Sequence, residues 1–467
     1  MPPLSNSRSI RPAARWLAGP ALAMLILGGC GGMSTRSTDT SKVVMSPVVA
    51  QASALAQSGT VLTGQARLDN ERQIRELLSQ LDDATLAREA AALPAGEPLY
   101  NYMGQALVER GLPLPRPFDH TAWTFDANGR PAADPDGYRP PVKLAMLLPL
   151  SGEMAVAASP VRDGFLAGYY GEHRRRPEVS FYDTTGSIAG TLSAYDRAVA
   201  EGNDFVVGPL ERNAVDALFT RGALPVSILA LNSGSQSPPA GNAAFALSPE
   251  DEGTAAAEYL VARGAKRVLV VSGSEDSQRR AVDALREHLA ARGATVTDVV
   301  GEGVADLTPF ANREGGIDAI FLSMRGNSVR ELMPKLALAG LAGKPRVATS
   351  QLLSGTGKPE DDRVLDGIAF PTETWTARGA RGLPTATFTA ETLPTARGGA
   401  ARLFAFGFDA WQLSAYMERL VTGTDASIPG ATGTLRMDGF GNIKRTPTWA
   451  TFISGVVMPL TDGSDRR

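Results

Sequence analysis

Cysteine and histidine are almost missing from this chain. Its 467 residues include one cysteine, Cys30, and three histidines, His120, His173 and His288, which lie in separate segments. One cysteine cannot form a disulfide within the chain, and no two histidines have the spacing of metal ligands. We therefore expect no metal site. His173 and His288 fall among charged residues in helical segments, and we expect them on the solvated surface.

An excess of charge of one sign is also missing, and so are complete catalytic motifs. The net charge is −3, without a long run of like charge, which argues against a partner nucleic acid. No Gly-x-Ser-x-Gly nucleophile elbow occurs in the sequence. The Gly-Thr-Gly-Lys segment at 355–358 lacks the first glycine of a phosphate-binding loop, and the glycines at 301 and 303 lack the third glycine of a dinucleotide loop. We therefore expect neither an enzyme nor a bound cofactor.

The apolar run near the N-terminus is too short to span a membrane. It covers residues 16–27, follows three arginines and leads into Cys30, whereas a spanning helix needs about 20 apolar residues. The arrangement resembles a bacterial lipoprotein signal, with residues 1–29 removed and Cys30 carrying lipid as the membrane anchor. No aspartate follows at Gly31, and by resemblance to proteobacterial lipoproteins this indicates the periplasmic face of the outer membrane.

Helical periodicity begins only after a polar stretch. The chain is 43% apolar and 20% charged, as globular proteins are. Residues 30–66, rich in Ser, Thr, Ala and Gln, are interpreted as a flexible tether. Residues 67–112 are predicted to form a short helical region. Residues 113–141, rich in Pro, Asp and Gly, are interpreted as a linker with turn-forming aspartates. The three helices expected in the helical region lie at 68–81, 84–93 and 98–110.

From residue 142 onward, buried-strand runs alternate with helical segments. This alternation predicts an α/β fold, with parallel sheets covered on both faces. We interpret residues 142–463 as two doubly wound lobes, with the chain crossing near 247 and returning to the first lobe near 370. Ser248 and Pro249 are expected to begin a helix that stops at Gly264. The strand-like runs lie at 142–150, 179–182, 205–207, 226–230, 243–247, 268–271, 296–300, 319–322 and 346–348.

Seven short sequence segments, called phrases below, indicate one particular family with this fold. They are Leu-Leu-Pro-Leu-Ser-Gly at 147–152, Val-Gly-Pro-Leu at 207–210, Leu-Ala-Leu-Asn at 229–232, Phe-Ala-Leu-Ser-Pro-Glu-Asp-Glu at 245–252, Ala-Arg-Leu-Phe-Ala-Phe-Gly-Phe-Asp-Ala-Trp at 401–411, Gly-Ala-Thr-Gly-Thr-Leu at 430–435 and Thr-Trp-Ala-Thr-Phe at 448–452. In this order they resemble the C-terminal domain of the penicillin-binding protein activator family (lipoproteins of the LpoA, YraM or LppC type), which has a type I periplasmic-binding-protein fold. The resemblance covers about two-thirds of the chain.

The resemblance implies a function without catalysis. Family members are outer-membrane lipoproteins that bind a class A penicillin-binding protein and stimulate peptidoglycan crosslinking. This chain departs from the better-studied members, because residues 67–140 stand in place of a large helical-repeat domain. Two alternatives remain open. The first is a periplasmic solute-binding receptor for amino acids or a similar small polar ligand, and the second is an envelope hydrolase, which lacks a visible nucleophile–base arrangement.

A cleft between the lobes is the expected place for any small polar ligand. In open α/β sheets, ligands gather beyond the carboxyl ends of the strands, where helix N-termini present free N–H groups. The alternative is that the residues at these strand ends only cap helices and turns. The candidates are Ser151, Gly152, Gly208, Pro209, Leu210, Asn232 and Ser233 in the first lobe, and Ser272, Ser274, Ser323 and Arg325 in the second.

One aromatic stretch has the spacing of a buried helix face. Its members are expected in the core rather than in a recognition surface. Asp409 is a charged residue within this aromatic stretch, and we expect it either to face the cleft or to cap a neighbouring helix. The aromatic residues are Phe404, Phe406, Phe408, Trp411 and Tyr416.

Overall fold

The computed structural model describes residues 45–120, 123, 129–423 and 426–460. The expected signal segment 1–29, the lipidation site Cys30 and the first part of the expected tether lie outside these residues. Residues 45–460, with these gaps, belong to one compact unit.

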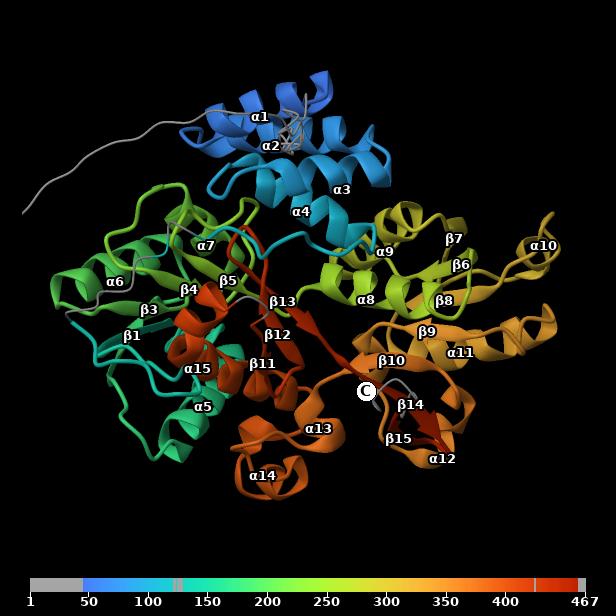
Figure 1. Cartoon of the computed structure of the whole chain (residues 1–467). Helices are drawn as coiled ribbons and strands as arrows, with labels where there is room; N and C mark the ends of the chain where they lie inside the picture. The colour runs from blue at the N-terminus through green and yellow to red at the C-terminus, as the bar shows by residue number, and fades with distance from the viewer. Residues whose placement is uncertain (1–44, 121–122, 124–128, 424–425, 461–467) are drawn as a thin grey trace, which may run out of the picture. The chain divides into compact units, whose positions relative to one another are not determined.

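The first lobe is a mostly parallel sheet with helices on both faces (Figure 1). Its strand order is β11-β12-β13-β5-β4-β3-β1-β2, and only β11 and β12 pair antiparallel to their neighbours. Residues of β1 alternate between two cores: Leu144, Met146 and Leu148 face α5 and α15, while Ala145 and Leu147 face α6 and α7. The strands are β1 (Lys143–Leu148), β2 (Glu178–Asp183), β3 (Phe205–Val207), β4 (Ile228–Ala230), β5 (Ala243–Phe245), β11 (Ile428–Pro429), β12 (Thr434–Met437) and β13 (Asn442–Thr446), and the helices are α5 (Ala155–Gly171), α6 (Ile188–Ala200), α7 (Arg212–Phe219) and α15 (Ala400–Thr422).

The second lobe repeats this plan with the strand order β15-β14-β10-β9-β8-β6-β7. The strands β10, β9, β8, β6 and β7 are parallel, and β14 and β15 add an antiparallel edge. The strands are β6 (Arg267–Ser272), β7 (Thr295–Gly301), β8 (Ala319–Ser323), β9 (Arg346–Ala348), β10 (Ala369–Thr372), β14 (Thr448–Ile453) and β15 (Val456–Pro459). The helical elements are α8 (Pro249–Val261), α9 (Asp276–Ala291), α10 (Thr308–Ala311), α11 (Gly326–Leu338), α12 (Pro359–Asp362) and the 3-10 turns η1 (Ser350–Leu353) and η2 (Arg363–Leu365).

The α/β class with two mostly parallel lobes is confirmed. The chain leaves the first sheet after β5 and enters the second at β6, through α8. Ser248 caps α8 as expected, because its hydroxyl accepts a hydrogen bond from the Asp251 N–H, and Gly264 follows with φ 78°.

The return to the first lobe, predicted near 370, begins a few residues later, directly after β10. Residues 369–372 form β10, which pairs with β9 and β14 in the second sheet. First-lobe contacts begin with Trp375 in α13 (Thr374–Arg378), whose N–H donates to the Ala431 carbonyl oxygen at 2.8 Å and whose ring stacks on Phe404 of α15. The chain then passes through α14 (Ala386–Thr392) and η3 (Pro394–Ala396) into α15. It crosses once more between β13 and β14, around Pro447, which sequence reasoning missed. Nothing in the sequence of β10 indicates whether this buried strand joins the first or the second sheet.

Helices α5 and α15 approach each other unusually closely. A Cβ at Gly164 would lie 1.9 Å from the Phe404 carbonyl oxygen, and a Cβ at Gly407 would lie 1.9 Å from the Val161 carbonyl oxygen. Both positions therefore require glycine for the helix backbones to touch. Four of the five aromatic residues expected in the core are buried: Phe404, Phe406, Phe408 and Trp411 are at most 3% exposed. Tyr416 is only partly buried, because its hydroxyl donates to Asp136 at 2.8 Å.

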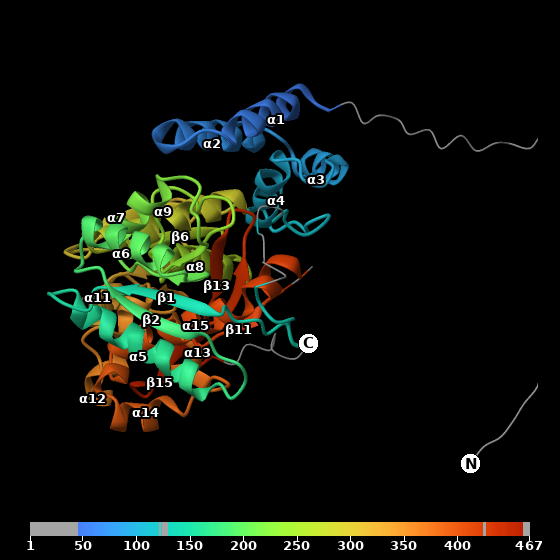
Figure 2. The same ribbon diagram turned by 90° about the vertical axis from the view of Figure 1, so that its left-hand side faces the viewer.

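The N-terminal helices form a small core of their own and contact the lobes. They are α1 (Pro47–Gly59), α2 (Gly64–Ser79), α3 (Asp83–Ala92) and α4 (Leu99–Glu109). Figure 2 shows α4 on the side of this group that faces the lobes. The Asn101 side chain on α4 donates a hydrogen bond to the Gly439 carbonyl oxygen at 2.7 Å, and the rings of Tyr102 and Phe440 lie 4.8 Å apart.

Two predictions for the N-terminal part need correction. The expected tether at 30–66 includes α1, which Ser46 caps and which buries Val49, Ala52 and Ala56. Small residues at helical spacing made this apolar face hard to recognise. The expected linker at 113–141 is also held in place where it is described, since Arg139 is buried and forms an ion pair with Glu418 at 2.7 Å. No helix in the described part of the chain is long and apolar enough to cross a membrane.

Candidate functional site between the lobes

The first-lobe candidates lie together at the carboxyl ends of β1, β3 and β4. Gly208 donates a backbone hydrogen bond to Leu229, and the Asn232 amide donates to the Leu210 carbonyl oxygen at 2.8 Å. The Ser151 hydroxyl donates to Asp183 at 2.6 Å. A Cβ at Gly208 would lie 2.1 Å from the Leu147 carbonyl oxygen, so this glycine permits a close backbone approach. Gly152, Pro209 and Ser233 belong to the same three loops.

The second-lobe candidates gather at the ends of β6 and β8. The Ser323 carbonyl oxygen accepts a hydrogen bond from Gly273, next to Ser272, and Arg325 forms an ion pair with Glu275 at 2.7 Å. The Ser323 hydroxyl donates to the Gln278 carbonyl oxygen. Ser274 is exposed, and its carbonyl oxygen accepts a hydrogen bond from Arg279. The candidates of each lobe therefore bond locally, and ligand binding by them stays a prediction.

A buried charge cluster that the sequence did not predict joins the two lobes. Arg402 on α15, in the first lobe, forms an ion pair with Glu252 on α8 at 2.5 Å and lies 3.3 Å from Glu373, which follows β10. Arg402 also donates a hydrogen bond to the Ser350 hydroxyl in η1. Arg445 on β13 lies 3.9 Å from Glu252 and donates to the Thr432 carbonyl oxygen at 3.2 Å. We call these side chains the interlobe cluster.

The cluster holds its central carboxylate ionised. Burial acts to raise the pKa of Glu252, but the charges of Arg402 and Arg445 and two hydrogen bonds from Ser350 outweigh it, so the pKa lies below its ordinary value. Burial likewise opposes the charge of Arg402, yet Glu252 and Glu373 raise the pKa of its guanidinium. A buried charge is tolerated only when paired in this way.

A cavity of about 260 Å³, with polar side chains in a largely apolar wall, lies beside the interlobe cluster. Leu247 and Leu403 contribute to it from the first lobe, while α9, β8 and η1 contribute from the second. Ser323 is the predicted candidate residue that lines it. The Thr349 hydroxyl in its wall is buried and has no hydrogen-bond partner in the described chain. Hydroxyls, amides and one guanidinium here could hold a small polar group. The polar lining residues are Glu252, Ser277, Gln278, Ser323, Thr349, Ser350, Gln351 and Arg402.

Asp409 neither faces this cavity nor caps a helix. It is completely buried and accepts hydrogen bonds from the Ala431 N–H, the Thr432 N–H and the Thr432 hydroxyl. Burial raises its pKa to about 7, while the bonds from Thr432 and Ala431 and the charge of Arg445 act in the opposite direction. Its role is to hold the loop at 430–433 against α15.

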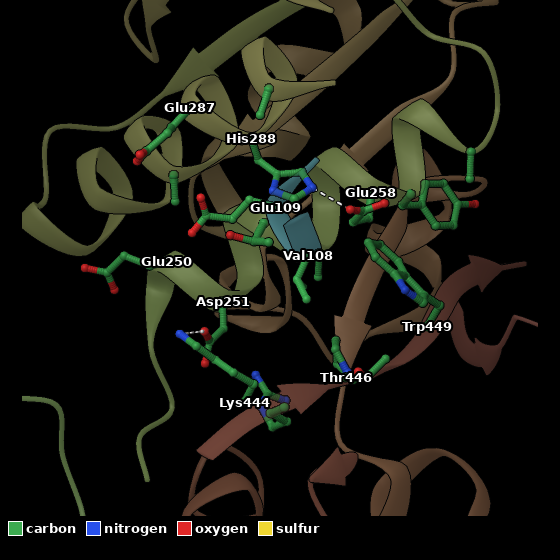
Figure 3. A pocket seen from close by; sticks show the side chains of 18 of the residues that line it. Val108, Glu109, Glu250, Asp251, Glu258, Glu287, His288, Lys444, Thr446 and Trp449 are labelled. Atoms are coloured by element: carbon green, nitrogen blue, oxygen red, sulfur yellow. Dashed lines mark hydrogen bonds and ion pairs between the residues drawn. The ribbon is translucent and has the colours of Figure 1, made fainter. Parts of the chain in front are cut away.

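A larger pocket, of about 720 Å³, lies between α4, α8, α9 and β13 (Figure 3). We call it the α4–α8 pocket. Its wall includes His288, which corrects the expectation of a solvated histidine: His288 is 8% exposed and its Nε2 lies 2.5 Å from Glu258. Charged neighbours in the sequence suggested a surface position, but the helix turns this side chain inward. In the described chain, no group of three or more metal-ligating side chains could hold a metal ion.

The two lobes and their connections define a periplasmic-binding-protein-like fold. Solved structures with this fold include the following two. The C-domain of LpoA (YraM) from Haemophilus influenzae, described as a regulator of PBP1A, has a TM-score of 0.60 and 22% identity, over 68% of this chain and 100% of that one. A putative branched-chain amino acid ABC transporter from Chromobacterium violaceum has a TM-score of 0.55 and 24% identity, over 67% and 100%.

The chain belongs to the LppC putative lipoprotein family, whose model matches residues 138–300 and 291–455. This confirms the family that the seven phrases indicated. Among curated relatives, the penicillin-binding protein activator LpoA of Photobacterium profundum is 26% identical over 68% of this chain and 57% of its own length. LpoA of Escherichia coli K12 is 25% identical over 61% of this chain and 48% of its own length. The chain thus spans about half the length of these relatives.

The likeness in structure also extends beyond the two lobes. Full-length LpoA from H. influenzae has a TM-score of 0.60 and 20% identity, and the match covers 91% of this chain and 72% of that one. The residues from 138 onward make up less than 91% of this chain, so the match also includes part of the N-terminal helices. At this identity the likeness concerns the fold.

Proposed function

We propose that this protein is a membrane-anchored activator of a class A penicillin-binding protein and that it performs no chemistry itself. The observation that carries the proposal is the family match across both lobes, together with relatives named penicillin-binding protein activators. Since the relatives are nearly twice as long as the matched part, the synthase and the mode of contact are part of the proposal.

The geometry between the lobes supports a docking role. Arg402 and Glu252 form an ion pair between the lobes, beside the interlobe cavity, and their charges satisfy each other. The lobes are therefore fixed to each other by the chain's own side chains. A fixed pair of lobes can present a surface of constant shape to a partner protein.

Activation by such a surface requires a preference between two states of the synthase. A ligand shifts a conformational equilibrium only by the difference in its affinity for the two states. The activator must therefore bind the active conformer of the synthase more tightly than the resting one. A tenfold increase in the active population requires a difference of about 1.4 kcal/mol.

The test is peptide crosslinking by the class A synthase of the same organism, with and without the purified full lipoprotein in detergent. A clear rise in crosslinked product supports the proposal. Unchanged crosslinking together with absent binding, measured by surface plasmon resonance, would refute it. A heat-denatured sample of the lipoprotein is the control for effects of added protein and detergent.

We further propose that Cys30 carries lipid and places the protein on the periplasmic face of the outer membrane. Support comes from the signal-like sequence before Cys30 and the description of the family as lipoproteins. Membrane fractionation of cells that carry wild-type protein or the Cys30→Ser variant tests this. Wild-type protein in the inner-membrane fraction would contradict the outer-membrane assignment, and an unchanged distribution of the variant would contradict lipidation.

A second candidate function, a receptor for a small polar ligand, is favoured by the partnerless Thr349 hydroxyl in the interlobe cavity. A ligand that binds the folded state stabilises it by about 4 kcal/mol at a thousandfold excess over Kd. Thermal unfolding with single amino acids at millimolar concentration measures this. A rise in Tm that the Thr349→Val variant loses would support the receptor.

A further inference from the structure

The α4–α8 pocket is distinct from the interlobe cavity and is built from three parts of the chain. Helix α4 contributes Val108 and Glu109, the second lobe contributes α8, α9 and Trp449, and β13 of the first lobe contributes Lys444 (Figure 3). Its volume of about 720 Å³ lies within the range of pockets that hold ligands or several partner side chains. The pocket also borders two of the three places where the chain crosses between the lobes, at the start of α8 and around Pro447.

The inner wall of the pocket is apolar and aromatic. The rings of Tyr259 and Trp449 lie 4.2 Å apart in this wall, and alanines of α8 and α9 line part of the rest. The Arg263 guanidinium lies 3.4 Å from the centre of the Tyr259 ring and adds one cation to the pocket. Aromatic rings next to small side chains form the kind of surface into which an apolar side chain of a partner packs. The wall therefore fits an apolar side chain rather than a fully charged ligand.

The rim of the pocket is acidic, and part of its negative charge has no counterion in the described chain. Glu250 forms an ion pair with Arg280 at 2.6 Å, Asp251 pairs with Lys444 at 3.6 Å, and Glu258 pairs with Arg292. Glu109 and Glu287 are exposed, and neither forms an ion pair with any described residue. Glu109 accepts a hydrogen bond from Gln105 at 3.0 Å, and the pKa of Lys444 is raised most by Asp251, with a smaller contribution from the charge of Glu109. These two carboxylates come from different elements, α4 and α9, and both border the same opening (Figure 3).

We infer that the α4–α8 pocket binds a segment of the synthase that carries Lys or Arg next to an apolar or aromatic side chain. This inference rests on the proposed function and names the chemistry of its contact. The apolar side chain enters between Trp449 and the alanines, and the cation lies at Glu109 and Glu287. Charge complementarity selects this occupant, because an acidic or neutral segment would leave the two carboxylates unpaired.

An occupant of this pocket touches both lobes and the N-terminal helices at once. Asp251 and Glu252 are neighbours at the start of α8, and Asp251 faces the pocket while Glu252 faces the interlobe cluster. Binding of a segment in the pocket is therefore coupled to the arrangement of the lobes that the interlobe cluster fixes. The docking site and the interlobe cluster share the first turn of one helix.

Charge reversal at the rim and filling of the pocket test the inference separately. The double variant Glu109→Lys/Glu287→Lys reverses the unpaired charges, and Ala291→Trp fills the pocket from an exposed position on α9. The matched controls, Glu331→Lys/Glu360→Lys and Ala337→Trp, place the same changes at exposed positions of α11 and α12, outside the pocket. Binding of the full lipoprotein to the class A synthase is measured as Kd at two salt concentrations, with crosslinking as the second readout.

We expect both pocket variants to weaken binding by roughly tenfold or more, with the controls unchanged. Binding of the wild type should also weaken at higher salt, whereas the residual binding of the charge-reversal variant should depend on salt less. Circular dichroism and Tm equal to wild type show that the variants are folded. A pocket variant that fails this check is replaced by Glu109→Gln/Glu287→Gln or Ala291→Phe.

Three results would overturn the inference. If wild type and pocket variants bind and stimulate equally, the synthase docks elsewhere and the proposed function stands. If wild type neither binds nor stimulates, the proposed function fails and the inference fails with it. If the pocket variants change only self-association in sedimentation, the occupant is a second copy of this chain.

Discussion

Arg402 on α15, whose side chain is 25% exposed, and the buried Glu252 on α8 form an ion pair that joins the two lobes across 150 residues of sequence. The carboxylate also accepts two hydrogen bonds from Ser350, and a second arginine, Arg445, lies 3.9 Å away. An opening of the lobes would separate these charges and leave them buried without partners. The ion pair therefore favours one arrangement of the lobes over others.

Removal of the arginine should destabilise the protein more than removal of both partners. Arg402→Met leaves Glu252 buried with only the more distant Arg445, and we expect a loss of about 3 kcal/mol in the free energy of unfolding. The double variant Arg402→Met/Glu252→Gln removes the unpaired charge and should recover part of this loss. Urea denaturation followed by circular dichroism measures both. A loss in the double variant equal to the sum of the two single variants would show that the pair does not interact.

The same carboxylate should make stability depend on pH on the acidic side. The pKa of Glu252 is lower in the folded protein than its ordinary value of 4.5, so the folded state favours the ionised form. Its contribution to stability is complete above pH 4.5 and is lost as pH falls through the folded pKa. We expect wild type and Glu252→Gln to differ in stability at pH 7 and to converge as pH falls below 4.5. A difference that stays constant from pH 7 to pH 3 would contradict this.

The two lobes could be predicted from the sequence because short buried strands and capped helices depend on residues that are close together in the chain. The runs around Leu147 and Val270 are apolar enough to be recognised alone, and Ser248 caps its helix through neighbours three residues away. The interlobe cluster could not be predicted in this way. Arg402 and Glu252 were visible in two of the seven phrases, but nothing in either phrase indicates that the other is its partner.

Helix α1 and His288 illustrate two other limits of sequence reasoning. The buried face of α1 consists of Val49, Ala52, Ser53 and Ala56, whose small size made the segment look like a tether. His288 lies among charged residues, yet the turn of α9 places it against Glu258. In both cases the neighbouring helix decides the burial, and the identity of that neighbour is a tertiary property.

Close contact of α5 and α15 should make Gly407 intolerant of any side chain. A methyl group at this position would lie 1.9 Å from the Val161 carbonyl oxygen, so the helices must separate. We expect Gly407→Ala to lower the free energy of unfolding by about 1–3 kcal/mol. Gly399→Ala, at the start of the same helix and with open space around it, is the control and should change stability little. Equal stability of the two variants by thermal unfolding would contradict the close contact.

Asp409 should be required as a carboxylate rather than as a polar side chain of the same size. Both of its oxygens accept hydrogen bonds from backbone N–H groups, one from Ala431 and one from Thr432. An asparagine has one acceptor oxygen, and its NH₂ group would face the other N–H donor. We therefore expect Asp409→Asn to lower the free energy of unfolding by about 1–3 kcal/mol at pH 8.5, where a carboxyl with a pKa of about 7 is ionised, because a buried donor loses its partner. Asp361→Asn, at an exposed position of α12, is the control for the same chemical change. Equal urea midpoints for Asp409→Asn and wild type would mean that the loop at 430–433 does not depend on this carboxylate.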